Sequence, residues 1–557
     1  MNIAEEAVDR WVERGRGDRV ALRCIDRAGR CDAVTYRQLM EDTNRFANVL
    51  RAHGVEAGDR VFLLLDRGRA LCTSALGTWK HRSVLGPLFP DFGPDPVRER
   101  ISTGNGRVLV TTRELYRRRV APVRDSLPGL ELILLVGEAA DVRRSGEPIP
   151  GAVDLAEALA AADPAYAIGP TDPEDLATLH FTSGTTGRPK AAMHVHGAVT
   201  AHRSSGQIAL GLGPGAIFWC TADPGWVTGT TYGIISPLAN GATVVVDQGA
   251  FDVERWYSIL EREHVSVWYT TPTALRMLHQ AGREGLGDHD LAALRLVASV
   301  GEPLDADTVR WTQEAWGTPA HDGWWQTETG GIMIANVAGE PVIPGSIGRP
   351  LPGVVATVLA RDDRADADGA PLVLDGHVVE VTDPDVEGHL ALRPGFPSMF
   401  RGYLDEERRY RACFVDGWYV TGDLVRRDAQ GAYWFVGRAD DVIKTSGHLV
   451  GPFEVEAALR SHPAVADAAV VGVPHPVAGT VIKAYVALRP GHSPSEELRR
   501  DLRGFARSRL GPAIAPRSFE FVDELPKTSS GKTIRRVLRL HALQGADAPL
   551  VTSGAAS

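Results

Sequence analysis

The sequence predicts an α/β protein with a large N-terminal domain and a small α+β C-terminal domain. Short apolar runs alternate with helical stretches, a region rich in Gly and Pro with strand-like alternation begins near residue 342, and a new α/β pattern starts after residue 444. Alternation of strands and helices is typical of sheets covered by helices. With 557 residues, of which 44% are hydrophobic, the chain can bury several large cores.

The elements are predicted in chain order. Ala4–Gly15 has a helical pattern, and RVFLLL (Arg60–Leu65) resembles a strand. A continuous apolar run bounded by turn residues is typical of a buried strand, which applies to four further segments: Leu130–Val136, Ala242–Asp247, Val265–Tyr269 and Leu294–Val300. From about Val342 we expect a β-rich subdomain, in which HVVEVTD (His377–Asp383) alternates as a strand does.

A second domain is expected after the sequence RADDVIK. Phe453–Leu459 is predicted to be a helix, Val465–Val473 a strand and Glu496–Arg509 a helix. The predicted organisation is an N-terminal domain over 1–437, a hinge over 438–444, a mobile C-terminal domain over 445–543 and a flexible tail over 544–557.

Composition excludes several classes of function. The net charge of −10 argues against nucleic acid or an anionic membrane as a partner. No apolar run is long enough to span a bilayer, and the acidic N-terminus lacks the features of a signal peptide. The five cysteines form no CxxC pair, which favours a cytoplasmic location. His194 and His196 share one face of a strand, but two histidines alone make a weak metal site.

The segment FTSGTTGRPK (Phe181–Lys190) raises the question of phosphate binding. It is not a Walker A loop, because Gly184 and Gly187 are too close together, and SSGKT near the C-terminus lacks the upstream glycine. Glycines and hydroxyl side chains after a strand nevertheless present several donors to an anion. From composition alone, a phosphate cradle and a polar surface loop remain equally open.

Further motifs follow in order along the chain: GEP from Gly301, WWQTETG from Trp324, YVTGD from Tyr419, GRADD from Gly437, KTSGHLVGPFEVE from Lys444 and PKTSSGKTIRR from Pro526. Together with the loop they strongly resemble the acyl-adenylate-forming (AMP-binding) superfamily over about residues 15–543. WWQTETG and DPGWVTG (Asp223–Gly229) resemble most closely the bacterial acetyl-CoA synthetases. The resemblance implies the acyl-adenylate-forming enzyme fold.

The resemblance also implies the reaction. Acetate and ATP give acetyl-AMP and pyrophosphate, and CoA then gives acetyl-CoA and AMP, with Mg²⁺ as the metal. The charge gathered in the first step requires donors and cations. Lys532 is implied to bridge the acyl carboxylate and the α-phosphate, Thr327 to lie near that phosphate, and Glu328 to help hold Mg²⁺, a hard cation suited to carboxylate oxygen.

The other implied nucleotide contacts fall into three groups. Asp423 would accept hydrogen bonds from the ribose, and Arg438 would reach the ribose or a phosphate. The adenine walls would be Gly301, Glu302 and Pro303 with Asp322, Gly323 and Trp324. The β- and γ-phosphates would be wrapped by Thr182, Ser183, Gly184, Thr185, Thr186, Gly187 and Lys190.

The resemblance assigns an acyl pocket and a CoA site. Trp325 across the pocket floor would leave room for one or two carbons. Asp440 matches the hinge about which the C-terminal domain rotates between half-reactions. Ser446, Gly447 and Arg507 are implied to contact CoA, the match at Arg507 being the weaker. The remaining pocket residues are Trp226, Val227, Thr228, Gly229 and Val300.

Three alternatives remain open: a ligase for propionate or a longer acid, acylation of a carrier protein by the same chemistry, and a non-catalytic nucleotide-binding scaffold. The family is regulated by acetylation of the lysine matching Lys532, which implies a lysine acetyltransferase and a deacetylase as partners. One departure is Leu449, which stands where related sequences carry an arginine that contacts AMP. That role is therefore not transferred.

Overall fold

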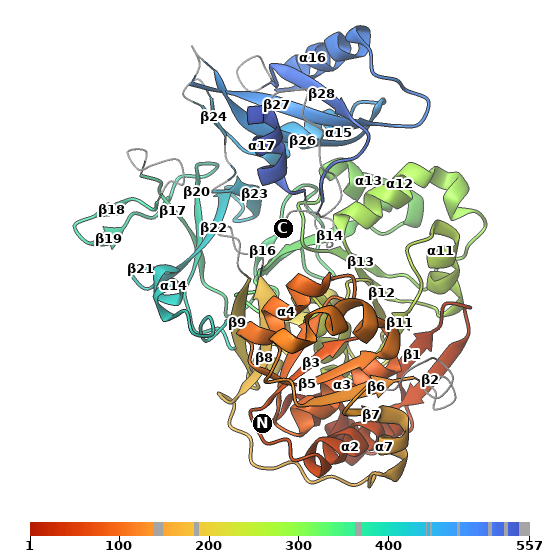
Figure 1. The fold of residues 1–557 in the computed structure, drawn as a ribbon. Helices are drawn as coiled ribbons and strands as arrows, with labels where there is room; N and C mark the ends of the chain where they lie inside the picture. Colours follow the sequence, from red (N-terminus) through yellow and green to blue (C-terminus); the bar gives the residue numbers. More distant parts are fainter. Residues whose placement is uncertain are drawn as a thin grey trace.

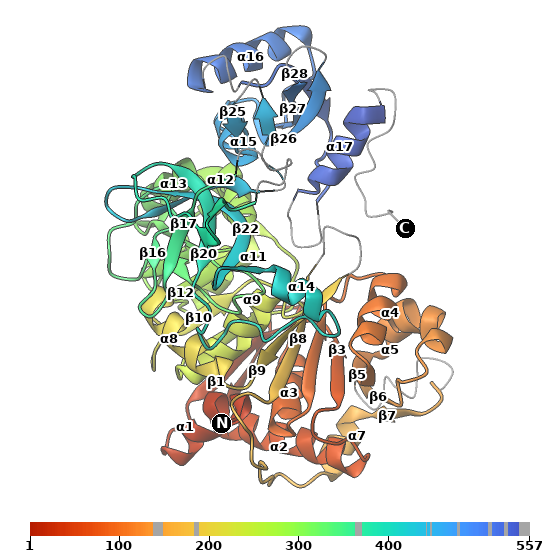
Figure 2. The same ribbon diagram turned by 90° about the vertical axis from the view of Figure 1, so that its left-hand side faces the viewer.

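The computed structural model describes residues 1–137, 149–182, 189–362, 370–439, 441, 443–445, 448–475, 479–510, 515–527 and 533–544. Over these residues the chain forms two large α/β layers, a β-rich sheet and a smaller C-terminal part, which lies at one end of the molecule (Figures 1 and 2). The predicted mixed α/β architecture with a large N-terminal and a small C-terminal part is confirmed.

The first sheet is mostly parallel. Val61 and Leu63 of β3 lie in a different core from Phe62 and Leu64, because successive side chains of a strand point to opposite faces. Both faces are therefore buried, which explains the continuous apolar run RVFLLL. The strand order is β7 (Ala152–Asp154), β6 (Leu132–Val136), β5 (Gly106–Thr112), β3 (Arg60–Leu64), β4 (Val84–Leu88), β8 (Leu176–Thr182) and β9 (Lys190–Val195).

The second sheet is also buried on both faces. Trp219 and Trp268 stack in one core, whereas Phe218 and Tyr269 point into another. Three strands expected from apolar runs form at its centre, each beginning one or two residues later than predicted. The order is β16 (Arg349–Pro350), β15 (Ile334–Ala335), β14 (Ala320–Trp324), β13 (Leu296–Ser299), β12 (Val267–Thr270), β10 (Ile217–Cys220), β11 (Thr243–Asp247), β1 (Val20–Ile25) and β2 (Cys31–Thr35).

Helices fill the space between and around these sheets (Figures 1 and 2). A capping box between Thr35 and Gln38 starts α2 (Tyr36–Ala52), and Leu39 and Phe46 of that helix lie in the core shared by the two sheets. The predicted N-terminal helix forms as a turn, Glu5–Asp9, that continues into α1 (Arg10–Glu13). The other helices here are α3 (Arg69–Lys80), α4 (Pro94–Thr103), α5 (Arg113–Leu115), α7 (Leu155–Ala161), α8 (Ala198–Leu210), α9 (Val227–Thr230), α10 (Ser236–Ala239), α11 (Val253–Arg262), α12 (Pro272–Leu286) and α13 (Ala306–Trp316).

The β-rich sheet forms as predicted, but one of the strands expected in this region is much shorter than predicted. Only His377–Val378 of the expected strand His377–Asp383 is a strand (β19), and it pairs with β18 (Val373–Leu374) across a turn at Asp375 and Gly376, both with positive φ. No residue of His377–Asp383 is fully buried: Val378 and Val381 are partly buried against two different cores, so the alternation gives no continuous buried face. The sheet contains β17 (Ala356–Leu359), β20 (Glu387–Leu392), β22 (Trp418–Arg427), β21 (Phe414–Val415) and β23 (Tyr433–Arg438), with α14 (Glu407–Ala412) beside it.

The C-terminal part has a core of its own, in which Val455, Val470 and Leu502 are buried. Its two predicted helices and its predicted strand all form. The elements are the hairpin β24 (Ile443–Thr445) and β25 (His448–Val450), α15 (Pro452–Arg460), β26 (Val465–His475), β27 (Gly479–Leu488), α16 (Glu496–Leu510), β28 (Ser518–Val522) and α17 (Arg535–Gln544).

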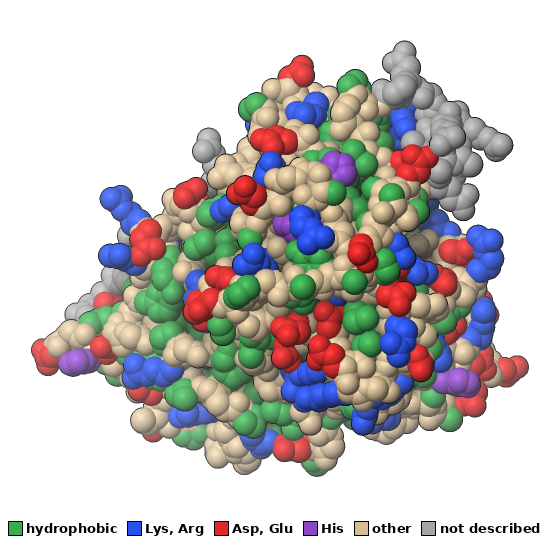
Figure 3. Space-filling model, turned by 90° about the horizontal axis from the view of Figure 1, so that it is seen from below, with side chains coloured by type: hydrophobic (Ala, Val, Ile, Leu, Met, Phe, Trp, Pro, Cys, Tyr) green, Lys and Arg blue, Asp and Glu red, His purple; other side chains and the backbone are tan. Residues whose placement is uncertain are grey.

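The surface seen from below in Figure 3 mixes acidic, basic and hydrophobic side chains, without one large area of a single charge. Among the described residues, no helix is long and apolar enough to cross a membrane. All five cysteines carry free thiols.

Candidate active site

The GEP and WWQTETG motifs lie at the carboxyl ends of parallel strands. In the second sheet β10, β12, β13 and β14 run parallel, so the segments that follow them leave at one edge. Val300–Pro303 follows β13, and Trp325–Glu328 follows β14. Ligands of open α/β sheets bind at such edges, which makes this edge the candidate active site.

The predicted adenine walls are tied together by Asp322. Its carboxylate accepts a hydrogen bond from Ser299 Oγ at 2.8 Å and one from the Leu304 N–H at 3.2 Å. Burial nevertheless raises the pKa of Asp322 to about 7. Asp322 thus fixes both ends of the segment that contains Gly301, Glu302 and Pro303, and Gly301 has a φ of +91°, which favours glycine.

The carboxylate of Glu302 is held by an arginine that the sequence analysis did not identify. Arg276 of α12 donates to Glu302 Oε2 at 2.6 Å, and Thr273 Oγ1 donates to the same carboxylate at 2.8 Å. Arg276 also faces Asp305 and, from the C-terminal part, Asp467, and these carboxylates raise its pKa against the effect of burial. Arg276 therefore links the predicted adenine wall electrostatically to the C-terminal part.

Asp423 and Arg438 come together through strand register. They are opposite each other on β22 and β23, and Arg438 Nη1 donates to Asp423 Oδ1 at 3.0 Å. Trp324 Nε1 and Gln326 Nε2 each donate to Asp423 Oδ2 at 2.8 Å. Asp423 thus joins the β-rich sheet to the WWQTETG segment, with its carboxylate held in one orientation.

Glu328 stands on a turn, and its side chain is connected through Tyr403 to Lys190, the last residue of the predicted phosphate loop. Tyr403 donates its hydroxyl hydrogen to Glu328 Oε1 at 2.7 Å, and the ring of Tyr403 lies 5.0 Å from Lys190 Nζ. Lys190 begins β9 and pairs with Thr182, the last residue of β8. Thr327 precedes Glu328 on the same turn, so the described ends of the phosphate loop and the predicted metal ligand are neighbours.

Mg²⁺ fits this arrangement. Among the described residues, no group of three His, Cys, Asp or Glu side chains is arranged to enclose a metal ion. Mg²⁺ does not require such a cage, since it keeps several waters and binds one or two carboxylates together with substrate phosphates. The half-buried carboxylate of Glu328 beside the phosphate loop is a donor of this kind.

The predicted acyl pocket is lined by aromatic rings. Trp325 is buried, donates from Nε1 to the hydroxyl of Tyr269 at 3.1 Å, and meets the ring of Tyr232 edge-on at 5.2 Å between centroids. Val300 and Val227 belong to the same core. These contacts fix the orientation of the indole, as a side chain that limits the length of a substrate requires.

The DPGWVTG segment approaches other backbone closely. A Cβ at Gly229 would lie 2.2 Å from the Asp223 carbonyl oxygen, so the start of α9 requires glycine. Trp226 packs between Phe89 and Phe92, with centroids 5.6 Å away in both cases. Thr228 lies on the same short helix, which places Trp226, Val227, Thr228 and Gly229 together beside β10.

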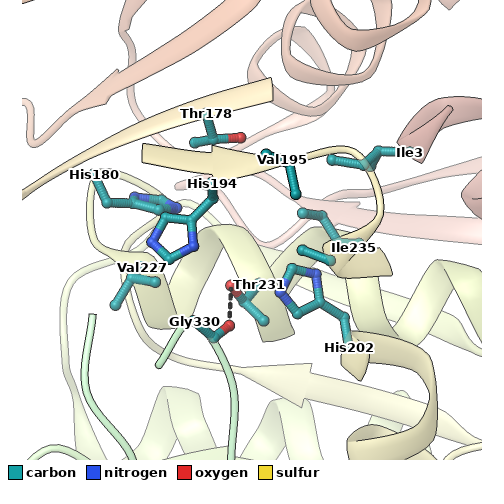
Figure 4. Close-up of a pocket in the computed structure, with 11 residues that line it drawn as sticks. Ile3, Thr178, His180, His194, Val195, His202, Val227, Thr231, Ile235 and Gly330 are labelled. Carbon is teal, nitrogen blue, oxygen red and sulfur yellow. Dashed lines mark hydrogen bonds between the residues drawn. The ribbon is translucent and has the colours of Figure 1, made fainter. Parts of the chain in front are cut away.

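Three buried histidines surround a cavity of about 10 Å³ beneath the Thr327–Gly330 turn. Figure 4 shows His180 and His194 side by side and His202 opposite them, near the bond from Thr231 to Gly330. Burial lowers the pKa of His194 to about 4 and that of His202 to about 3. The histidines are therefore neutral, and His194 holds the Ser398 carbonyl through Nδ1 at 3.1 Å, whereas His196 accepts from the Ile3 N–H.

Some predicted site residues are not joined to this arrangement. Arg507 is exposed on α16, at the outer end of the molecule in Figures 1 and 2. Leu449 lies in β25, where its backbone pairs with Lys444. The remaining predicted residues lie outside the described residues: Ser183, Gly184, Thr185, Thr186, Gly187, Asp440, Ser446, Gly447 and Lys532.

Gln326, Arg276 and Tyr403 are among the residues of the candidate site that the sequence analysis did not identify. Gln326 lies within the WWQTETG motif, so its position in that motif could have identified it as a residue of the site. Arg276 and Tyr403 reach the site from α12 and from the segment before α14, and no local pattern marks them.

The chain belongs to the AMP-binding enzyme family, whose model matches residues 8–404, and the AMP-binding enzyme C-terminal domain matches residues 454–532. These matches confirm the resemblance found in the motifs. The first match covers the segments that follow β13 and β14, and the second covers most of the C-terminal part.

Curated relatives are similar over nearly the whole chain. The acetyl-coenzyme A synthetase of Bacillus subtilis (strain 168) is 44% identical over 97% of this chain and 90% of its own. The acetyl-coenzyme A synthetase of Xanthobacter autotrophicus is 38% identical over 97% of this chain and 83% of its own.

Solved structures agree with the fold. An acyl-CoA synthetase of Brucella canis is 34% identical with a TM-score of 0.71, covering 98% of this chain and 94% of its own. An anthranilate CoA ligase in complex with anthranoyl-AMP is 28% identical with a TM-score of 0.85, covering 97% of each chain.

Proposed function

We propose that this protein is an AMP-forming acetate–CoA ligase. Acetate oxygen bonds to the α-phosphorus of ATP while the bond to the pyrophosphate leaving group breaks. The CoA sulfur then bonds to the acyl carbon, AMP leaves and the thiol proton is released. The observation that carries the proposal is that the adenine wall, Asp423, Glu328 and the pocket of Trp325 all converge at one edge of the second sheet.

The nucleotide is held by fixed groups in this proposal. Glu302 and Asp322 support the adenine walls, and Asp423 accepts hydrogen bonds from the ribose hydroxyls. Arg438, already beside Asp423, adds positive charge toward the ribose and phosphates. A bound Mg²⁺ would offset the negative charge of the phosphates; Glu328 would help to hold it, and Thr327 would lie near the α-phosphate.

The acyl pocket selects a short acid. Trp325, held by Tyr269 and Tyr232, occupies the space that a longer chain would need. Propionate is expected to be a poorer substrate by only a modest factor, since one methylene contributes roughly 1–3 kcal/mol to discrimination. The longer-acid and carrier-protein alternatives are outcomes of the substrate panel described below.

Two conformations of the C-terminal part complete the proposed cycle, with the hinge over 438–444 at Asp440. Lys532 neutralises the repulsion between carboxylate and α-phosphate in the first, and Ser446, Gly447 and Arg507 contact CoA in the second. Acetylation of Lys532 by an acetyltransferase would remove its charge and stop adenylation until a deacetylase restores it. We place the protein in the cytoplasm, which suits five free thiols.

The test is acid-dependent exchange of labelled pyrophosphate into ATP over formate, acetate, propionate, butyrate and hexanoate. We expect exchange to be fastest with acetate; none with any acid would identify a non-catalytic scaffold. Lys532→Ala should abolish exchange but leave synthesis of acetyl-CoA from preformed acetyl-AMP largely intact. Equal loss of both half-reactions would refute the two-conformation cycle.

A further inference from the structure

We infer that Tyr403 is a positioning residue that holds the carboxylate of Glu328 for a divalent cation and links it to Lys190 at the end of the phosphate loop. The inference rests on the proposed function, in which Glu328 faces Mg²⁺. It adds a residue that no motif marks.

The segment Phe400–Tyr403 holds Glu328 at two points. The hydroxyl of Tyr403 donates to Glu328 Oε1 at 2.7 Å, and the backbone N–H of Phe400 donates to the Glu328 carbonyl at 2.8 Å. Both the backbone and the side chain of Glu328 are therefore fixed by residues about 75 positions further along the chain. A carboxylate held in this way loses little rotamer freedom when a cation binds.

Tyr403 is itself rigidly placed. It is only 4% exposed, and its ring meets that of Phe400 edge-on at 5.1 Å between centroids. The backbone around it runs antiparallel to β9: Tyr403 bridges Ala192, and the Leu404 N–H donates to the Ala191 carbonyl at 2.9 Å. Since β9 begins at Lys190, the same ladder fixes Tyr403 and the end of the phosphate loop.

The chemistry of a phenol suits this position. A tyrosine hydroxyl is a neutral donor at neutral pH, so it orients Glu328 without cancelling its charge. It occupies Oε1 and leaves Oε2 to a cation. An ammonium in its place would compete with Mg²⁺. The ammonium of Lys190 instead lies over the ring of Tyr403, 5.0 Å from its centroid.

The experiment compares Tyr403→Phe with Tyr410→Phe in the full-length protein. Both changes remove one hydroxyl and keep the ring, and Tyr410 packs on the same Phe400 at 5.0 Å. Mn²⁺ binding in the presence of ATP is measured by electron paramagnetic resonance, and the Mg²⁺ dependence of pyrophosphate exchange is measured in parallel. We expect Tyr403→Phe to weaken Mn²⁺ binding about 10-fold, at the lower end for loss of an outer-shell partner, and Tyr410→Phe to match the parent protein.

High Mg²⁺ should restore most of the exchange rate of Tyr403→Phe, because the defect is in cation binding. Unchanged Mn²⁺ binding, or a rate that excess Mg²⁺ does not restore, would overturn the inference. Glu328→Gln separates it from the proposed function. If Glu328→Gln weakens Mn²⁺ binding and Tyr403→Phe does not, only the role of Tyr403 fails; if Glu328→Gln binds Mn²⁺ normally, the assignment of Glu328 fails and the inference with it.

Discussion

Trp325 donates a hydrogen bond from its indole Nε1 to the hydroxyl of Tyr269 at 3.1 Å, across the end of the proposed acyl pocket. Tyr269 belongs to none of the sequence motifs. It lies on β12, which pairs with β13, the strand that Val300 follows. The orientation of the Trp325 ring is thus fixed by its hydrogen bond to Tyr269 and by its packing against the ring of Tyr232.

Trp325→Gly should shift the acid preference toward longer chains. Removing the indole opens the pocket, so kcat/KM for hexanoate should exceed that for acetate, measured by pyrophosphate exchange over the acid series. Tyr269→Phe is the control, since it removes only the hydroxyl that orients the indole and should keep acetate first. An unchanged series in Trp325→Gly would show that the tryptophan packs the core without limiting the substrate.

Asp423→Asn should weaken ATP binding. In asparagine an NH₂ group replaces one of the two carboxylate oxygens that accept hydrogen bonds. This NH₂ group would face either the donor of Arg438 or the donors of Trp324 and Gln326, so the hydrogen bonds on that side would be lost. Loss of a hydrogen bond to a charged group costs about 1.5–3 kcal/mol, which corresponds to roughly 10- to 100-fold in KM for ATP. KM for acetate should change little.

Asp428→Asn provides the matched control for that measurement. Asp428 accepts a bond from Trp434 Nε1 at 3.0 Å, the same kind of pair, but it belongs to the turn between β22 and β23. Its KM for ATP should equal that of the parent protein. Equal effects of the two changes would mean that Asp423 is important for the sheet and not for the nucleotide.

The motifs GEP and WWQTETG predicted neighbouring parts of the candidate site, because they lie at the carboxyl ends of β13 and β14, and the carboxyl ends of parallel strands lie at one edge of a sheet. Asp322 and Glu302 were predicted to form one adenine wall; Asp322 accepts a hydrogen bond from the Leu304 N–H, which brings the two segments together, and their contact with adenine stays a prediction. Tyr403 was not predictable, because its contact with Glu328 depends on pairing with β9. The strand prediction was wrong beyond Val378, because alternation alone does not show whether the apolar side chains share one buried face; here Val378 and Val381 pack against two different cores.

His202→Leu should make the protein more resistant to acid. Burial lowers the pKa of His202 to about 3, below its ordinary value, so the unfolded chain binds a proton that the folded chain does not. Stability therefore falls as pH drops below about 6.5, by roughly 1.4 kcal/mol per pH unit for each such histidine. Removing His202 should reduce that slope between pH 6 and 4 in urea unfolding.

The control for acid stability is His377→Leu. His377 has 79% of its side chain exposed, so the change should leave the slope as it was. A slope that His202→Leu does not alter would mean that the histidine cluster accepts protons without unfolding.

Lys80→Met should destabilise the N-terminal part. Lys80 has no exposed side-chain surface and donates from Nζ to Asp9 at 2.6 Å and to Asn44 at 2.7 Å. Without the ammonium, the Asp9 carboxylate stays buried and unpaired, which costs about 3–5 kcal/mol. The midpoint of urea unfolding, followed by tryptophan fluorescence, should fall accordingly. The double variant Asp9→Leu with Lys80→Met should recover much of that loss, because no charge is left buried. A double variant as unstable as Lys80→Met alone would show that this region is stabilised by packing of the lysine stem and not by its charge.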